Sequence, residues 1–154
     1  MTSFLTLRAA QRADLLDIIR IMAHDKLGQQ RERFSEPLSE AYISAFKVIQ
    51  ADDHQELMVA EQAGQVIGAL QLSFLQYLSY QGGLRAQVEN VHVRDDLRGQ
   101  GIGTAMLRWA IARAQERGAH LLQLTTDKQR SDALRFYQQL GFVASHEGMK
   151  LPFR

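Results

Sequence analysis

The hydrophobic period of this 154-residue chain changes along its length, and that change constrains the fold more than any other feature. Apolar residues in the range 14–23 recur at helical spacing, and Asp14 is placed to start that helix. A second helical pattern begins at about Ser39. From Leu57 the pattern alternates with a period of two, which is typical of strands. A chain that changes from helical to strand periodicity and back again predicts a sheet covered by helices.

The order of these patterns predicts the topology. A short strand comes first, two helices and three strands follow, and helices and strands then alternate. Residues 24–36 and 76–83 are expected to be loops, and residues 63–65 a hairpin turn. The order β-α-α-β-β-β-α-β-α-β-β predicts an α/β fold with a mixed sheet flanked by helices. The expected strands are residues 4–8, 57–60, 66–75, 86–93, 121–125, 142–144 and 149–151, and the expected helices are residues 14–23, from about 39, 103–117 and 131–140.

Composition excludes several classes of protein. Hydrophobic residues make up 45% of the chain and charged residues 23%, which is typical of a globular protein, so we expect one domain over residues 1–154. The formal net charge of +1 argues against a general nucleic-acid binder. The absence of cysteine excludes disulfides, thiolate metal sites and a cysteine nucleophile. No apolar run reaches membrane-spanning length and the first eight residues lack a signal-peptide core, so we expect a soluble cytoplasmic protein with no membrane partner.

The glycine-rich run RGQGIG at residues 98–103 lies between an expected strand and an expected helix. Glycines allow a backbone to approach a ligand closely, and the N–H groups at a helix start bind anions. Arg94 and Arg98 are expected to add positive charge. The alternative is a tight loop that only caps the helix.

Two other phosphate-binding motifs do not fit this run. It lacks the Lys-Ser/Thr pair of a P-loop, which disfavours nucleotide triphosphate hydrolysis. Met106 occupies the place of the third glycine of a dinucleotide-binding motif, and the run follows the fourth expected strand rather than the first.

Three segments resemble those of the GNAT superfamily of acetyltransferases. The pattern R-x-x-G-x-G at residues 98–103 resembles the superfamily's pyrophosphate-binding motif, Gln/Arg-x-x-Gly-x-Gly/Ala. Val-His-Val at residues 91–93 resembles its fourth strand, and A-x-x-F-Y-x-x-x-G-F at residues 133–142 resembles its second motif. The order of strands and helices agrees as well, so the resemblance covers nearly the whole chain.

This resemblance implies acetyl-coenzyme A as the donor cosubstrate and direct transfer of the acetyl group to an acceptor, usually an amine. It also implies a V-shaped splay between the fourth and fifth strands, with the pantetheine arm along residues 91–93. The family often has asparagine where this chain has Arg130, so Ser131 is a candidate to replace that contact. The residues that the resemblance places at the coenzyme are Val91, His92, Val93, Arg98, Gly99, Gln100, Gly101, Ile102, Gly103, Thr104 and Ser131.

Glu89 is the candidate general base. Free amines have pKa values near 10, so a side chain or a water chain must accept a proton before the amine attacks a thioester. Many members of the family carry a base four residues before the position of Val93. Alternation in this strand places Glu89, Val91 and Val93 on one face, and places His92 on the opposite face, where we expect it to pack. The alternative for Glu89 is a solvated or salt-bridged strand residue.

Tyr137 matches the family's tyrosine that assists the departing sulfur. A phenol has a pKa near 10 and a thiol near 8.5, so a hydrogen bond to the developing thiolate is easier to defend than full proton transfer. Tyr137 also lies on the apolar stripe of its expected helix, so the alternative is a plain core residue, and the resemblance favours the functional role. A free backbone N–H around Val93 is expected to stabilise the carbonyl oxygen as it becomes negative.

Other polar residues carry weaker interpretations. Tyr77, Tyr80 and residues 24–36 lie where the family usually builds its acceptor pocket, although the two tyrosines are equally plausible as ordinary loop aromatics. The five histidines have no ligand spacing, so no metal is expected. The basic residues of the C-terminal region are expected at the surface, with contact to the phosphates of the coenzyme as the alternative: Lys128, Arg130 and Arg135.

Two classes of function remain open at this point. One is an N-acetyltransferase, monomeric or homodimeric, acting on a primary amine of a small molecule or a peptide. The other is a catalytically silent regulatory module that binds acyl-coenzyme A with the same fold. Turnover discriminates them, since a module without catalysis holds acetyl-coenzyme A and releases no thiol.

Overall fold

A computed structural model of the protein describes residues 4–153, which belong to two compact units, Met1–Gln123 and Leu124–Arg154. No helix among these residues is both long enough and apolar enough to cross a bilayer. The elements of the first unit are β1 (Thr6–Ala9), a 3-10 turn η1 (Arg12–Asp14), α1 (Leu15–His24), α2 (Gly28–Arg31), α3 (Glu40–Ala51), β2 (Gln55–Gln62), β3 (Gln65–Gln76), α4 (Ser79–Gly82), β4 (Leu84–Val93), a 3-10 turn η2 (Asp95–Leu97), α5 (Ile102–Glu116) and β5 (Leu121–Gln123).

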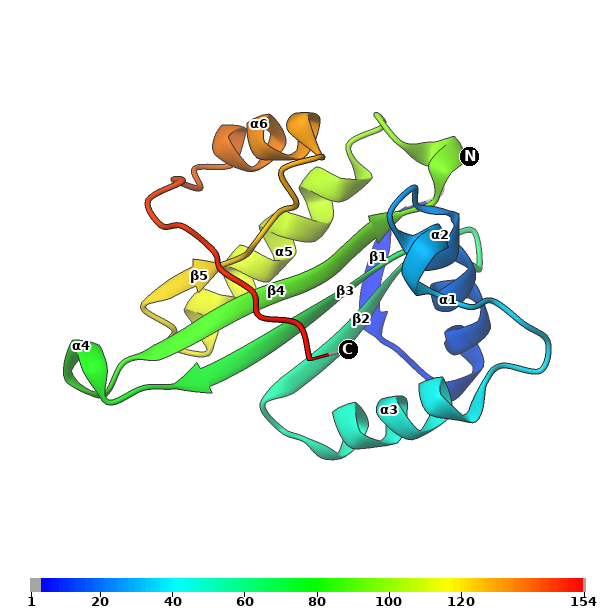
Figure 1. The fold of residues 1–154 in the computed structure, drawn as a ribbon, viewed down its shortest axis with the longest axis horizontal. Coiled ribbons are helices and arrows are strands. Elements are labelled where there is room, and N and C mark those ends of the chain that lie inside the picture. Colours follow the sequence, from blue (N-terminus) through cyan, green and yellow to red (C-terminus); the bar gives the residue numbers. More distant parts are fainter. Residues whose placement is uncertain (1–3, 154) are drawn as a thin grey trace. The chain divides into compact units, whose positions relative to one another are not determined.

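The first unit is built on a five-stranded mixed sheet in the order β1-β2-β3-β4-β5 (Figure 1). All neighbouring strands are antiparallel except β4 and β5, which are parallel. The β4–β5 pairing covers only residues 85–87 and 121–123, whereas β4 continues to Val93. No strand in residues 4–153 pairs with that side of β4 beyond Gln87. The mixed sheet flanked by helices confirms the predicted fold class.

The two faces of this sheet pack against different helices. On one face, Ile18 of α1 and Phe46 of α3 share a buried cluster with Val59 and Ala69 of the sheet. On the other face lies α5, with Met106 and Leu107 fully buried. A Cβ added to Gly68 of β3 would stand 3.0 Å from the Met106 sulfur, so this glycine allows α5 to approach the sheet closely. Complete burial of a Leu or Met side chain contributes about 1.5–3 kcal/mol, so these two layers supply much of the stability.

A β-bulge in β4 changes which face each residue occupies. Ala69 pairs with His92 and Gln71 pairs with Glu89, so two residues of β4, Asn90 and Val91, stand against the single residue between Ala69 and Gln71. Asn90 has a φ of +53°, a conformation that asparagine tolerates better than most residues. Directly paired residues share a face, so His92 lies on the same face as Glu89.

The expectation from simple alternation was therefore wrong. Val93 pairs with Gly68 and lies on the α5 face, opposite to Glu89 rather than beside it. The physical reason is the extra residue, because inserting one residue into a strand reverses the facing of everything beyond it. A bulge is defined by the pairing of two strands. The alternation of residues within one strand carries no information on that pairing, so the bulge could not be predicted from it.

Other local predictions hold with shifted boundaries. Ser39 caps α3, and its Oγ accepts a hydrogen bond from the backbone N–H of Ala41 at 3.3 Å. The expected loop at residues 24–36 contains the single turn α2, and residues 76–83 contain the turn α4. The strand expected at residues 121–125 ends at Gln123.

In residues 124–153 of the second unit the structure has one helix, α6 (Ser131–Gln139), as predicted. Gly141 has a φ of +97° and follows the end of this helix, as expected for a glycine stop. The two closing strands expected at residues 142–144 and 149–151 are not formed. A strand needs a hydrogen-bonded neighbour, and these segments have no ladder within the described residues, while the side chains of Val143, Met149 and Leu151 are exposed.

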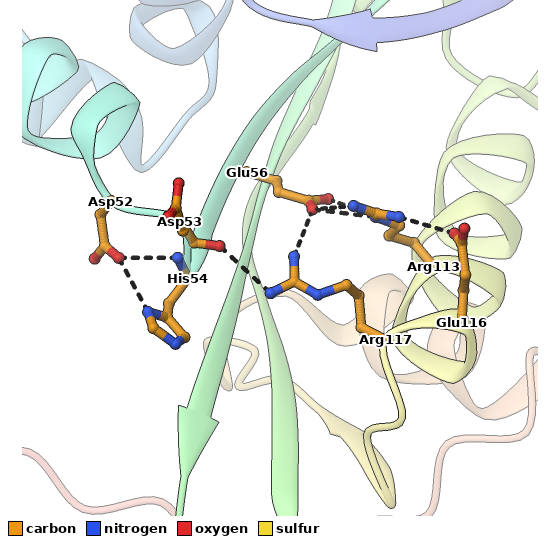
Figure 2. A network of polar contacts seen from close by, with 7 residues as sticks. All are labelled: Asp52, Asp53, His54, Glu56, Arg113, Glu116 and Arg117. Atoms are coloured by element: carbon orange, nitrogen blue, oxygen red, sulfur yellow. Dashed lines mark hydrogen bonds and ion pairs between the residues drawn. The ribbon is translucent and has the colours of Figure 1, made fainter.

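A polar network joins α5 to β2 (Figure 2). The Glu56 carboxylate accepts hydrogen bonds from Arg113 Nη2 at 2.6 Å and from Arg117 Nη1 at 3.0 Å. The Arg117 guanidinium also lies 4.2 Å from the centroid of the Phe74 ring. Glu116 binds Arg113 from the solvent side at 2.9 Å. Because the Glu56 side chain is only 17% exposed, this network holds the C-terminal half of α5 against the sheet.

We expect Glu56→Gln to lower the free energy of unfolding by about 1–3 kcal/mol, because two partly buried guanidinium groups lose their shared counter-charge. Glu116→Gln is the matched control. It removes a carboxylate that binds the same Arg113 but is 68% exposed, so the expected loss is about 0.5 kcal/mol or less. Urea denaturation of both variants measures the difference, and equal losses would contradict a special role for Glu56.

Candidate functional site

The turn between β4 and α5 requires glycine at two positions. Gly99 has a φ of +76° and Gly101 a φ of +82°, both in the left-handed region. A Cβ built on either residue meets no protein atom within 4 Å. The glycines are therefore needed for the backbone conformation rather than to relieve crowding within the protein, and the space around both Cα atoms is open.

The turn leads directly into the N-terminus of α5. Gly101 is the N-cap residue, and no side chain caps this end of the helix. The N–H of Ala105 donates to the carbonyl of Gly101 at 3.0 Å, so the N–H groups of residues 102–104 precede the regular helical hydrogen bonds. Together with the helix dipole, these groups form an anion-binding site.

The two arginines expected to add charge are both paired with aspartates. Arg94 Nε donates to Asp96 at 2.7 Å, and this hydrogen bond lowers the pKa of the Asp96 carboxyl. Arg98 Nη2 lies 2.6 Å from Asp95 and 3.7 Å from the buried Asp25. Carboxylates therefore offset the charge of both arginines, and the backbone N–H groups are the donors that the turn itself offers to an anion.

The edge of β4 beyond Gln87 leads toward this turn. Beyond Gln87 this side of β4 has no partner strand among residues 4–153, and the bulge at Asn90 and Val91 interrupts the regular ladder with β3 on the other side. A bulge leaves its extra residue unpaired and redirects the strand. The donor-strand candidates Val91, His92 and Val93 all lie in this stretch; His92 is buried and the other two are half-buried.

Glu89 is half-buried, and its neighbours on the same face of the sheet are the amide side chains of glutamines. Gln87 Nε2 donates to Glu89 Oε1 at 2.9 Å, and Gln123 Nε2 of β5 donates to Gln87 Oε1 at 2.9 Å. Gln71 of β3 stands directly opposite Glu89. Glu89 forms no ion pair with a described residue, which disfavours the salt-bridged alternative. We call Gln71, Gln87, Glu89 and Gln123 the polar row.

Sequence reasoning found Glu89 but missed the three glutamines. Glutamine is common on solvated strand faces, so the presence of a glutamine does not by itself indicate a functional site. The available signal was the spacing of two between Gln87 and Glu89, which puts both on one face.

Tyr137 lies in the second unit, on α6. Its ring is half-buried and contacts the Phe142 ring edge-on with 5.8 Å between centroids, and the Phe142 N–H donates to the Tyr137 carbonyl at 3.1 Å. Ser131 is the exposed first residue of the same helix, directly after Arg130. The ring contacts support a packing role, and they leave the role of the hydroxyl to a kinetic test.

Tyr77 and Tyr80 both contact one cation. The Arg85 guanidinium carbon lies 4.4 Å from the Tyr77 ring centroid and 5.3 Å from that of Tyr80. His120 stacks on Tyr80 with 4.8 Å between the ring centroids. The two tyrosines are therefore organised around a charged group. In the described part of the chain, no three His, Asp or Glu side chains gather as possible metal ligands.

Comparisons with known proteins identify the class. The sequence model of the acetyltransferase (GNAT) family matches residues 20–142. The aminoalkylphosphonate N-acetyltransferase of Salmonella typhimurium is 31% identical over 107 residues, covering 70% of this chain and 69% of that protein. The L-methionine sulfoximine/L-methionine sulfone acetyltransferase of Pseudomonas paraeruginosa is 31% identical over 143 residues, covering 91% and 81%. A solved structure described as a transcriptional regulator from Bacillus halodurans C-125 is 52% identical, with a TM-score of 0.95 over 97% of this chain and all of that one.

This chain belongs to the acetyltransferase (GNAT) family. The family match and the two curated relatives support an N-acetyltransferase of that family.

If the turn binds the pyrophosphate of coenzyme A, as the resemblance implies, Gly101→Ala is expected to weaken that binding by roughly ten-fold or more, because the cost of a left-handed L-residue shifts the backbone N–H groups of the turn. Gly118→Ala is the matched control at the other end of α5. Gly118 has a φ of +79° and equally open space, so its substitution carries the same backbone cost of about 1–2 kcal/mol. Calorimetric titration of the two folded variants compares them, and equal affinities would refute a role for the turn in binding.

Proposed function

We propose that this protein transfers the acetyl group of acetyl-coenzyme A to the primary amine of a small molecule or a peptide by direct attack. The observation that carries the proposal is one continuous feature: the unpaired edge of β4 leads into a left-handed glycine turn at the uncapped N-terminus of α5. Family membership supports the same donor. The match spans both units, which supports one acetyltransferase domain over residues 1–154.

The donor is held mainly by backbone groups in this proposal. The pyrophosphate binds the N–H groups of the turn, at residues 98–104, where the helix dipole favours negative charge. The pantetheine arm carries amides and follows the free edge of β4 at residues 91–93, as an added strand would. Ser131 is proposed as a further contact to the arm, in the place where the family often has asparagine.

The reaction forms a carbon–nitrogen bond and breaks a carbon–sulfur bond. Glu89 accepts a proton from the ammonium group of the acceptor, and the free amine then attacks the thioester carbonyl. A backbone N–H released from the ladder by the bulge stabilises the oxygen as it becomes negative. The electron pair of the broken bond leaves on the sulfur, and the Tyr137 hydroxyl donates a hydrogen bond to that thiolate.

The acceptor is proposed to carry an acidic group besides its amine. The names of the Salmonella typhimurium and Pseudomonas paraeruginosa relatives describe substrates with an amine and an acid function, and a further relative is named the L-amino acid N-acyltransferase MnaT of Escherichia coli. Release of free thiol from acetyl-coenzyme A in the presence of such acceptors tests the proposal. Tight binding of the donor without thiol release for any amine would refute it.

A second candidate is a catalytically silent regulatory module that binds acyl-coenzyme A. It is favoured by the description of the Bacillus halodurans structure as a transcriptional regulator, at 52% identity. The half-buried Glu89, held by Gln87 and without an ion-pair partner among residues 4–153, argues for the enzyme. The thiol-release measurement separates the two candidates.

We expect Glu89→Gln to lower the turnover number by roughly a hundred-fold and to remove the acidic limb of the pH–rate profile, since the amide accepts no proton. The affinity for acetyl-coenzyme A should not change. Glu61→Gln is the control, because Glu61 is a half-buried strand carboxylate whose partner is Arg8. Survival of the acidic limb with the same apparent pKa would assign the base to another group or to water.

We expect Tyr137→Phe to lower the single-turnover rate by roughly ten- to a hundred-fold while the Michaelis constants stay nearly unchanged. The substitution keeps the ring that contacts Phe142 and removes only the hydroxyl. Tyr42→Phe is the control for loss of a tyrosine hydroxyl. The Tyr42 hydroxyl donates to Glu32 at 2.8 Å, in the segment expected at the acceptor pocket, so its loss should change stability or the Michaelis constant of the acceptor and leave the single-turnover rate at saturation unchanged. An acetyl donor with a more acidic thiol should reduce the Tyr137→Phe defect. If the variant has wild-type single-turnover rates, the role of Tyr137 is packing alone.

A further inference from the structure

Arg85 differs from the other half-buried arginines of residues 4–123. Its guanidinium has no carboxylate partner among the described residues, and its Nε is buried without a hydrogen-bond partner. A partly desolvated cation without a counter-charge is costly to keep, so its position calls for an explanation. The other half-buried arginines in these residues, each paired with a carboxylate, are Arg8, Arg20, Arg94, Arg113 and Arg117.

Figure 1 shows α4 at the end of the hairpin that joins β3 to β4. Aromatic rings contact the Arg85 guanidinium in this part of the chain. It lies against both Tyr77 and Tyr80. Tyr80 is supported in turn by stacking on His120, whose Nδ1 hydrogen-bonds the Leu84 carbonyl at 2.9 Å. Stacking on rings holds the plane of a guanidinium and leaves its terminal N–H groups for a ligand in that plane.

The backbone of α4 is strained at Tyr80, one of the two tyrosines that contact Arg85. Tyr80 and Gln81 have φ values of +54° and +59°, which L-residues adopt rarely and at a cost of about 1–3 kcal/mol each. Leu78 in the same turn is almost fully exposed, so apolar burial of that side chain does not explain the conformation. Tyr80, in this left-handed conformation, has its ring 5.3 Å from the Arg85 guanidinium carbon.

Arg85 lies on the same face as the candidate base. Residues 85, 87 and 89 alternate on one side of β4 before the bulge, so Arg85 and Glu89 are at the two ends of a line with Gln87 between them. Four residues of strand separate their Cα atoms by about 13 Å. The Arg85 guanidinium leans toward Tyr77 at the hairpin end and does not shorten this span. The glutamines of the polar row lie along it, and amides both donate and accept hydrogen bonds.

We propose that Arg85 binds the acid group of an elongated acceptor whose amine reaches Glu89. The inference rests on the proposed function and extends it to a substrate class. An extended peptide covers about 3.3–3.6 Å per residue, so a span of about 13 Å fits an acceptor of about four residues. The side-chain amides of the polar row complement peptide groups between its ends. The acceptor is a short peptide, or a peptide-like acid of that length, with a free N-terminus and a free C-terminal carboxylate.

Tetraglycine and its C-terminal amide are the matched probes, titrated calorimetrically into the protein saturated with coenzyme A. The wild type should bind the carboxylate form about ten-fold or more tightly than the amide, since an arginine–carboxylate pair is charge-assisted. Arg85→Gln should reduce this preference to near one by weakening only the carboxylate form, and Arg85→Lys should restore part of it. For glycine and glycinamide, which are too short to reach Arg85, the substitution should change nothing.

The control is Arg108→Gln, which removes the same charge from an exposed position on α5 and should leave the preference intact. If neither tetraglycine probe binds, or if the preference survives Arg85→Gln, the proposal is wrong. Equal weakening of both probes, with a lower melting temperature, would instead make Arg85 a structural support for α4. Binding of acetyl-coenzyme A and thiol release with other amines are measured on the same protein, so the acetyltransferase proposal stands or fails separately.

Discussion

The extra residue in β4 at Asn90 and Val91 is the constraint on which the site depends. Before it, the strand directs Glu89 and the polar row away from α5; beyond it, His92 occupies that face and Val93 turns to the α5 face. Because of this one inserted residue, the strand presents the Glu89 carboxylate on one face. Its hydrogen bonding to β3 is then interrupted before the strand reaches the glycine turn. Asn90 allows this because its left-handed backbone costs less than it would for a branched residue.

Helix α5 is held so that its free end remains available. Its C-terminal half is bound to β2 through Glu56, and Met106, in its N-terminal third, is buried where the helix comes close to Gly68. The N-terminus has no side-chain cap, and the neighbouring Arg94 and Arg98 are occupied by aspartates. An anion at this end would therefore meet oriented backbone dipoles on a rigid helix, which lose little freedom on binding.

Much of the fold followed from periodicity because burial of one face imposes it on sequence. The apolar stripe of α1 and the start of α3 at about Ser39 were predicted from local patterns, and the glycine turn was located by its run of glycines between an expected strand and an expected helix. The closing strands at residues 142–144 and 149–151 were wrong, since alternation indicates an extended segment but not a partner for it. Within the site, Glu89 was found through a resemblance, whereas Gln71 and Gln123 become its neighbours only when strands β3 and β5 are placed beside β4.

The sequence by itself determined the order of the main helices and strands as far as α6, the position of the glycine turn and the family. These depend on interactions between residues close in the chain, or on patterns kept within one segment. Tertiary structure alone decided the facing of His92, the pairing of Arg94 and Arg98 with aspartates, and the isolation of Arg85 between aromatic rings. Each of these depends on strand register or on side chains from separate segments, and a register shift of one residue reverses a face without altering the local pattern.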